Sequence, residues 1–252
     1  MSFTVIGVDC ATQEERTGLA YGVVDETGAL ELRRVTLGTA GESAPATAAS
    51  WIAGASRYVV ALDAPLGWPT GLRESLGRHR AGQPVAAAPE RMFRRETDRF
   101  VQSELGRHPP EVGADRVART AHAALALLQQ IGEAAGAPLP LAWTPGTSSG
   151  AIEVYPAATL LSRGISPTGY RGDTSAGRKA RAAIFDRLQG ELSTSVSRDL
   201  LVDDADLLDA VLCVVAAADF ARGEALMPQD RSTAEIEGWI WFRGHGQRSL
   251  FE

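Results

Sequence analysis

The sequence predicts an α/β fold, a mixed β-sheet with flanking helices. Three strand-like segments follow one another near the N-terminus, and the later strand-like segments alternate with helical ones. Consecutive short strands form an antiparallel meander, whereas a helix between two strands favours a parallel crossover. The 252 residues suffice for one large domain or two small ones. Because no low-complexity linker or internal repeat divides the chain, we expect a single domain over residues 1–252.

The first four strands are predicted within the N-terminal quarter of the chain. Residues 3–9, 18–25 and 30–37 are rich in β-branched and aromatic residues or alternate in polarity, which is typical of strands. An alanine-rich helix is expected at 44–56 and a fourth strand at 57–63. The intervening helix predicts that the fourth strand lies parallel to the first and beside it.

The chain after the fourth strand is less regular. Residues 64–115 hold many prolines, glycines and arginines, and we expect short helices there at best. A longer helix is predicted at 116–135, so that a helical and loop insertion of about 64–150 separates the fourth and fifth strands. Beyond it we expect a fifth strand at 151–155, helices at 156–163, 176–190 and 203–222, and a final strand at 238–243.

The composition is that of an ordinary globular protein and argues against several classes of function. The net charge of −6 counts against indiscriminate binding of nucleic acid, although a local basic channel is compatible with it. No apolar run is long enough to span a bilayer, and no secretory signal precedes the first strand. Two cysteines, Cys10 and Cys213, are too few for a disulfide framework. We therefore expect a cytoplasmic protein that does not bind membranes.

Four aspartates stand where a metal site would need them. Asp9 and Asp63 end the first and fourth strands, and parallel neighbours end at the same edge of a sheet. Asp206 and Asp209 lie three apart on a predicted helix and so share a face. Buried carboxylates are costly unless they are paired or bind a cation, and oxygen ligands favour Mg²⁺ or Mn²⁺. The alternative interpretation is that these residues cap turns or complement a helix dipole.

Two further groups of charged residues are candidates for the site. Glu153 lies in the fifth strand between Ile152 and Val154, and could be a catalytic metal ligand, a supporting group or the partner of a nearby arginine. Arg94, Arg95 and Arg99 lie in the insertion. Their guanidinium groups could contact phosphate, or they could form a solvated, salt-bridged helix face.

Six short segments, in order along the chain, resemble the DUF429 family, which is described as a family of predicted ribonuclease H-like nucleases. They are Gly7-Val8-Asp9-Cys10-Ala11, Asp63-Ala64-Pro65-Leu66-Gly67, Arg95-Glu96-Thr97-Asp98-Arg99, Glu153-Val154-Tyr155-Pro156-Ala157, Asp206-Leu207-Leu208-Asp209-Ala210 and Glu237-Gly238-Trp239-Ile240. The predicted order of strands is also that of the ribonuclease H-like fold. The resemblance therefore implies a ribonuclease H-like, mixed five-stranded sheet and a nuclease activity.

The acids are also similar to those of Holliday-junction resolvases, in which one aspartate lies on the first strand, one acid on the fourth and two acids, three apart, on the last helix. Asp9, Asp63, Asp206 and Asp209 fit these places. Because the chain is acidic, the expected substrate is short or single-stranded nucleic acid, or a nucleotide-like phosphodiester, rather than a long duplex.

The leading hypothesis is a metal-dependent nuclease or phosphodiesterase with two Mg²⁺ or Mn²⁺ ions about 4 Å apart. Asp9 would bridge the ions, and Asp63, Asp206 and Asp209 would complete their ligand shells. One alternative is an actin-like ATPase or sugar-kinase-like phosphotransferase, which would need a second glycine-rich phosphate loop. Another is a non-catalytic binding or regulatory protein of the same fold. Trp239 and Trp241 are compatible with a packed core or with a homodimer.

Overall fold

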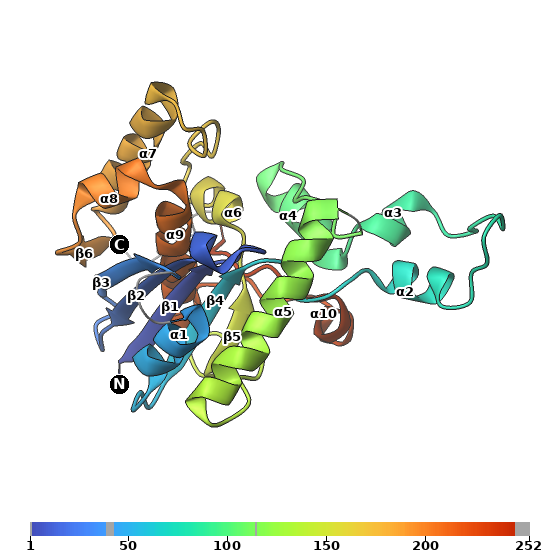
Figure 1. Cartoon of the computed structure of the whole chain (residues 1–252), viewed down its shortest axis with the longest axis horizontal. Coiled ribbons are helices and arrows are strands. Elements are labelled where there is room, and N and C mark those ends of the chain that lie inside the picture. The colour runs from blue at the N-terminus through green and yellow to red at the C-terminus, as the bar shows by residue number, and fades with distance from the viewer. Residues whose placement is uncertain (1, 39–42, 114, 245–252) are drawn as a thin grey trace, which may run out of the picture.

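This computed structural model describes residues 2–38, 43–113 and 115–244. The described residues form a six-stranded mixed sheet in the order β5-β4-β1-β2-β3-β6 (Figure 1). The strands β1 to β3 form an antiparallel meander, β4 and β5 add in parallel beside β1, and β6 adds in parallel beside β3. The bounds are β1 Phe3–Asp9, β2 Gly18–Val24, β3 Leu30–Leu37, β4 Tyr58–Asp63, β5 Gly150–Glu153 and β6 Leu192–Thr194.

Helices flank both faces of this sheet. The α-helices of the described residues are α1 Ala44–Ile52, α2 Thr70–Leu76, α3 Pro89–Phe93, α4 Glu96–Leu105, α5 Asp115–Ala135, α6 Pro156–Leu161, α7 Ser175–Leu188, α8 Arg198–Asp203, α9 Ala205–Arg222 and α10 Arg231–Glu237. Helices α1 and α5 lie on one face of the sheet and α9 lies on the other (Figure 1). Helix α9 is buried nearly all round, which explains its continuous apolar sequence.

Two glycines allow α9 to lie unusually close to the sheet. A Cβ atom at Gly7 of β1 would stand 2.0 Å from the carbonyl oxygen of Ala210, and one at Gly18 of β2 would stand 2.3 Å from that of Asp206. Only glycine fits at such distances, because a real Cβ atom does not approach backbone atoms so closely. The close approach brings the N-terminal turns of α9 beside the C-terminal end of β1 and the N-terminal end of β2.

The segment between β4 and β5 contains α2 to α5. Helix α5 packs against α1 over the sheet, while α2 and α3 extend away from it (Figure 1). Helix α10, although it comes near the end of the chain, packs against α2 and α4. None of the helices described in 2–38, 43–113 and 115–244 combines the length and hydrophobicity that crossing a membrane requires.

The predicted mixed α/β fold with flanking helices is confirmed, and the strand order is consistent with a ribonuclease H-like sheet. The predicted number of five strands is wrong, because the short β6 adds a sixth at the edge of β3. The predicted helix at 203–222 is confirmed as α9, which begins two residues later because the side chain of Asp204 caps it, and the short α8 before it was not predicted. The predicted final strand at 238–243 forms only isolated bridges, at Ile240 and Arg243.

The two tryptophans of that final segment belong to the core. Trp239 and Trp241 are 1% and 2% exposed. Trp239 packs against Phe100, and Trp241 packs edge-on against Phe220. Neither indole is therefore available for a subunit contact, and the homodimer stays a prediction without support from these residues.

Candidate metal centre

Asp9 and Asp63 meet because of strand register. The last residue of β1 lies directly opposite the last residue of β4 in the parallel pair. Successive side chains of a strand point to opposite faces, and Val5 and Val59 belong to the core under α9. Asp9 lies four residues after Val5 and Asp63 four residues after Val59, so both aspartates point to the α9 face as well.

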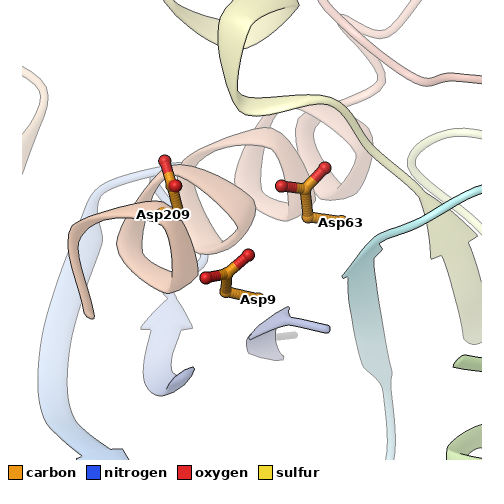
Figure 2. Close-up of side chains that lie close together, drawn as sticks. All are labelled: Asp9, Asp63 and Asp209. Atoms are coloured by element: carbon orange, nitrogen blue, oxygen red, sulfur yellow. The ribbon is translucent and has the colours of Figure 1, made fainter. Parts of the chain in front are cut away.

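Asp209 completes the cluster from α9. It lies in the second turn of the helix and is 1% exposed. Figure 2 shows the carboxylates of Asp9, Asp63 and Asp209 close together and pointing to the same side, from β1, β4 and α9. One carboxylate oxygen from each residue lies within 4.8 Å of those from the other two. This is the spacing at which three oxygens can bind one cation.

A loop between α6 and α7 supplies polar partners to this cluster. The guanidinium Nη2 of Arg171 lies 2.7 Å from Asp209 Oδ2 and 3.0 Å from Asp63 Oδ2. The hydroxyl of Tyr170 donates a hydrogen bond of 2.5 Å to Asp209 Oδ1. The side chain of Arg171 remains 57% exposed, so its cationic group forms part of the entrance to the site.

Within the described part of the chain, Asp9 has neither an arginine nor a tyrosine partner of the kind that holds Asp209. Its side chain is nine-tenths buried, and no cationic side chain among the described residues lies within ion-pair distance of it. Burial and the negative charges of Asp63 and Asp209 hold the pKa of Asp9 well above its usual range. Burial likewise raises the pKa of Asp63 to about 6 and that of Asp209 to about 7, although Arg171 opposes both shifts. When all three acids are ionised, the cluster therefore has more negative charge than Arg171 balances, and the raised pKa values express that cost.

Asp206 lies beside the cluster but not within it. Its carboxylate pairs with Arg16 at 3.3 Å and its side chain is 27% exposed. Its negative charge still adds to the upward shifts of the pKa values of Asp9 and Asp209, after burial and nearer charges. The structure therefore brings together three of the four predicted metal ligands, with the fourth at the periphery.

Glu153 belongs to a different group of charges. Ile152 and Val154 lie in the core under α9, so Glu153 points to the opposite face. There it forms an ion pair with Arg95 at 2.8 Å and accepts a hydrogen bond of 2.9 Å from the backbone N–H of Leu66. Of the roles left open by the sequence, this geometry matches the partner of a nearby arginine.

The three predicted phosphate-binding arginines lie in different surroundings. Arg95 is 1% exposed, and its guanidinium is held by Glu153, Asp98 and the carbonyl oxygen of Glu237. These contacts account for Arg95 without a phosphate. Arg94 pairs with Glu111 at 3.3 Å, and the exposed Arg99 donates to the carbonyl oxygen of Arg94.

Two functional candidates had no signal in the sequence. Tyr170 and Arg171 lie in an irregular loop, and no local pattern predicts that this loop reaches the sheet edge. Arg181 of α7 fixes its position: this guanidinium is 1% exposed and donates to the carbonyl oxygens of Tyr170, Gly172 and Val202. This buried arginine therefore links the loop to the end of α8, which directly precedes α9.

The comparisons with known proteins place this site within a family. The model of the family described as "Protein of unknown function (DUF429)" matches residues 7–233, which include the whole aspartate cluster. The chain belongs to the DUF429 family. This membership confirms the resemblance found in the six sequence segments, while the description of DUF429 assigns no activity. No curated protein and no solved structure matched the chain.

Proposed function

We propose that this protein is a metal-dependent phosphodiesterase that acts on nucleic acid or on nucleotide-like phosphodiesters. One observation carries the proposal: three carboxylates from β1, β4 and α9 converge, and Asp9 among them is nearly buried without a cationic partner in the described residues. A protein interior does not keep uncompensated charge for stability, and perturbed carboxylates of this kind are typical of functional sites.

The donor set fits a hard divalent cation. Asp9, Asp63 and Asp209 offer only carboxylate oxygens, which are the ligands that Mg²⁺ and Mn²⁺ prefer. Asp206 is near enough to influence the site electrostatically. A bound Mg²⁺ or Mn²⁺ would neutralise charge on the phosphoryl oxygens and lower the pKa of water.

The residues around the cluster have separate tasks in this mechanism. Arg171, with its exposed guanidinium at the entrance, binds the phosphate of the incoming substrate. Tyr170 holds the carboxylate of Asp209 in one orientation through its hydroxyl. Hydrolysis consumes one water: its oxygen bonds to phosphorus, the P–O bond to the leaving hydroxyl breaks, and a proton from the water reaches the leaving oxygen through solvent.

The proposal includes a cytoplasmic location. Cys10, directly after β1, and Cys213 of α9 are both free and buried, although both thiols contact the carbonyl oxygen of Val8. Free thiols are typical of reducing compartments.

Hydrolysis of bis(p-nitrophenyl) phosphate with Mn²⁺ tests the proposal. We expect the wild type to release p-nitrophenol and Asp9→Asn to lose about 100-fold or more of that rate, because the variant removes a buried ligand charge while keeping the shape. Asp25→Asn, in an exposed turn, is the control and keeps the wild-type rate. Full activity of folded Asp9→Asn would refute the role of the cluster. Binding of ATP with phosphoryl transfer would instead favour the phosphotransferase.

A further inference from the structure

A cavity of about 210 Å³ opens beside the aspartate cluster. Its charged lining includes Asp9, Asp63 and Arg171, the ion pair of Arg95 and Glu153, and Arg116 from the first turn of α5. Pro109, Pro110, Val117 and Tyr155 add apolar and aromatic surface. The lining thus combines charged and apolar groups within one small space.

Arg116 gives the cavity a cationic group that no acid neutralises. It is exposed and takes part in no ion pair among the residues that the structure describes, whereas Arg95, which also lines the cavity, is paired with Asp98 and Glu153. Arg116 and Arg171 therefore both offer guanidinium groups to the cavity that Asp9 and Asp63 line. Guanidinium groups match the geometry of phosphate oxygens.

The distribution of charge along the sequence points to the same side of the molecule. Residues 70–120 contain ten of the 25 basic residues but only seven of the 31 acidic ones, so this segment has a net charge of +3 while the rest of the chain carries −9. An anionic substrate is therefore attracted to the insertion side and repelled elsewhere.

The size of the cavity limits what it can hold. Pockets for drug-sized ligands have volumes of about 300–1,000 Å³, so about 210 Å³ suits a single small unit. Proteins that grip a duplex do so over a broad basic surface, whereas this chain is acidic outside one segment. An unpaired base, by contrast, can leave a strand and enter such a pocket, and aromatic side chains provide stacking surfaces for it.

We infer that this cavity takes one unpaired nucleotide unit, which makes single-stranded or short nucleic acid the substrate class; the inference rests on the proposed function. The phosphate lies between the aspartate cluster, Arg171 and Arg116. The base lies against Tyr155, Pro110 and Val117. A base-paired nucleotide cannot enter without leaving its helix.

Binding of three probes tests the inference on the full chain with saturating Mn²⁺. We expect adenosine 5′-monophosphate to bind more tightly than ribose 5-phosphate, and ribose 5-phosphate more tightly than inorganic phosphate.

Val117→Trp fills the cavity beside its apolar lining residues and should weaken binding of adenosine 5′-monophosphate about tenfold or more, with Mn²⁺ binding unchanged. Arg116→Ala should weaken binding of all three probes about tenfold. Arg119→Ala, an exposed neighbour on the same helix that does not line the cavity, is the matched control and changes none of them.

Cleavage assays provide the second readout. A ten-nucleotide single strand, as DNA and as RNA, should be cleaved faster than the matching duplex, and Val117→Trp should slow that cleavage while leaving hydrolysis of bis(p-nitrophenyl) phosphate less affected. Equal binding of adenosine 5′-monophosphate and inorganic phosphate, or equal cleavage of single strand and duplex, would overturn the inference while leaving the phosphodiesterase standing. Failure of the wild type to bind Mn²⁺ or to hydrolyse any diester would instead overturn the proposed function itself.

Discussion

Two groups of buried carboxylates lie close together in this protein and differ in how their charge is balanced. Asp98 and Glu153 both pair directly with the buried Arg95, and backbone N–H groups supply further hydrogen bonds. The cluster of Asp9, Asp63 and Asp209 has three acids and, among the described residues, the half-exposed Arg171 as its one paired cation. In the first group both carboxylates bond directly to the arginine, whereas in the second Asp9 has no ion pair within the described part of the chain.

The difference separates a structural role from a functional one. The paired group joins the insertion to the sheet, because Arg95 precedes α4 while Glu153 ends β5. Each of its carboxylates bonds directly to Arg95 and to a backbone N–H group, which leaves little capacity for a ligand. The aspartate cluster retains that capacity, and a divalent cation would supply the missing charge. Variants of the two groups should therefore affect stability in opposite directions.

Breaking the paired group should have the largest effect. Arg95→Met leaves Glu153 and Asp98 buried without their cation, and we expect a loss of about 3–5 kcal/mol in the free energy of unfolding. Urea denaturation measures it. Arg99→Met, on the exposed side of α4, is the matched control and should change stability by no more than about 0.5 kcal/mol. Asp9→Asn should have the opposite sign and stabilise the metal-free protein at pH 8, because it removes an unbalanced buried charge.

Moving α9 away from the sheet should move Asp209 away from Asp9 and Asp63. Gly7→Val places a side chain against the carbonyl oxygen of Ala210 and forces the helix outward. We expect a loss of stability of about 1–3 kcal/mol together with weaker Mn²⁺ binding. Gly190→Val, at an exposed turn with open space around its Cα, should leave Mn²⁺ binding unchanged. Wild-type affinity in folded Gly7→Val would show that the close approach of α9 is not needed.

The unbalanced cluster should also respond to pH. Because burial raises the folded-state pKa values of Asp63 to about 6 and Asp209 to about 7, these groups favour the folded state at low pH, and that contribution is lost as pH rises through 6 to 7. We therefore expect the metal-free protein to lose stability between pH 4 and pH 8. Mn²⁺ must displace those protons, so its affinity should fall about tenfold or more from pH 8 to pH 5.5. Thermal unfolding with and without Mn²⁺ measures both trends. A Mn²⁺ affinity independent of pH would contradict the idea that the metal displaces protons from these aspartates.

The smallest expected effect concerns Arg171. Its guanidinium occupies part of the space between Asp63 and Asp209, so it competes with a cation for their oxygens. Arg171→Ala should bind Mn²⁺ several-fold more tightly than the wild type, although it hydrolyses substrate more slowly. Arg178→Ala, an exposed residue of α7 that pairs with Asp203, is the control for removal of positive charge. Weaker Mn²⁺ binding in Arg171→Ala would show that Arg171 supports the metal site rather than competing with it.

Local patterns in the sequence were sufficient for much of the fold. The bounds of β1 and β3 match the predicted ranges, because β1 is a dense apolar run that ends at Asp9 and β3 alternates in polarity before Gly38. The pairing of β1 with β4, and hence the meeting of Asp9 and Asp63, followed from the helix between them. The three-residue β6 carries too little pattern to be predicted and depends on its neighbour β3.

The site could be predicted only as far as regular elements determine it. The direction of Glu153 was available from alternation, because Ile152 and Val154 on either side must face the core. Asp206 and Asp209 share a helix face, but only the packing of α9 at Gly7 and Gly18 decides which of them reaches β1. Tyr170 and Arg171 lie on a loop whose course depends on tertiary contacts, which no local pattern encodes.

The most direct test of the unbalanced cluster is calorimetric titration of the wild type and Asp9→Asn with Mn²⁺ at pH 8. The wild type should bind Mn²⁺ saturably, and Asp9→Asn should bind it at least about 100-fold more weakly while remaining folded. Asp25→Asn should match the wild type. Equal binding by the wild type and folded Asp9→Asn, or no binding by either, would contradict the account of this cluster as a metal site.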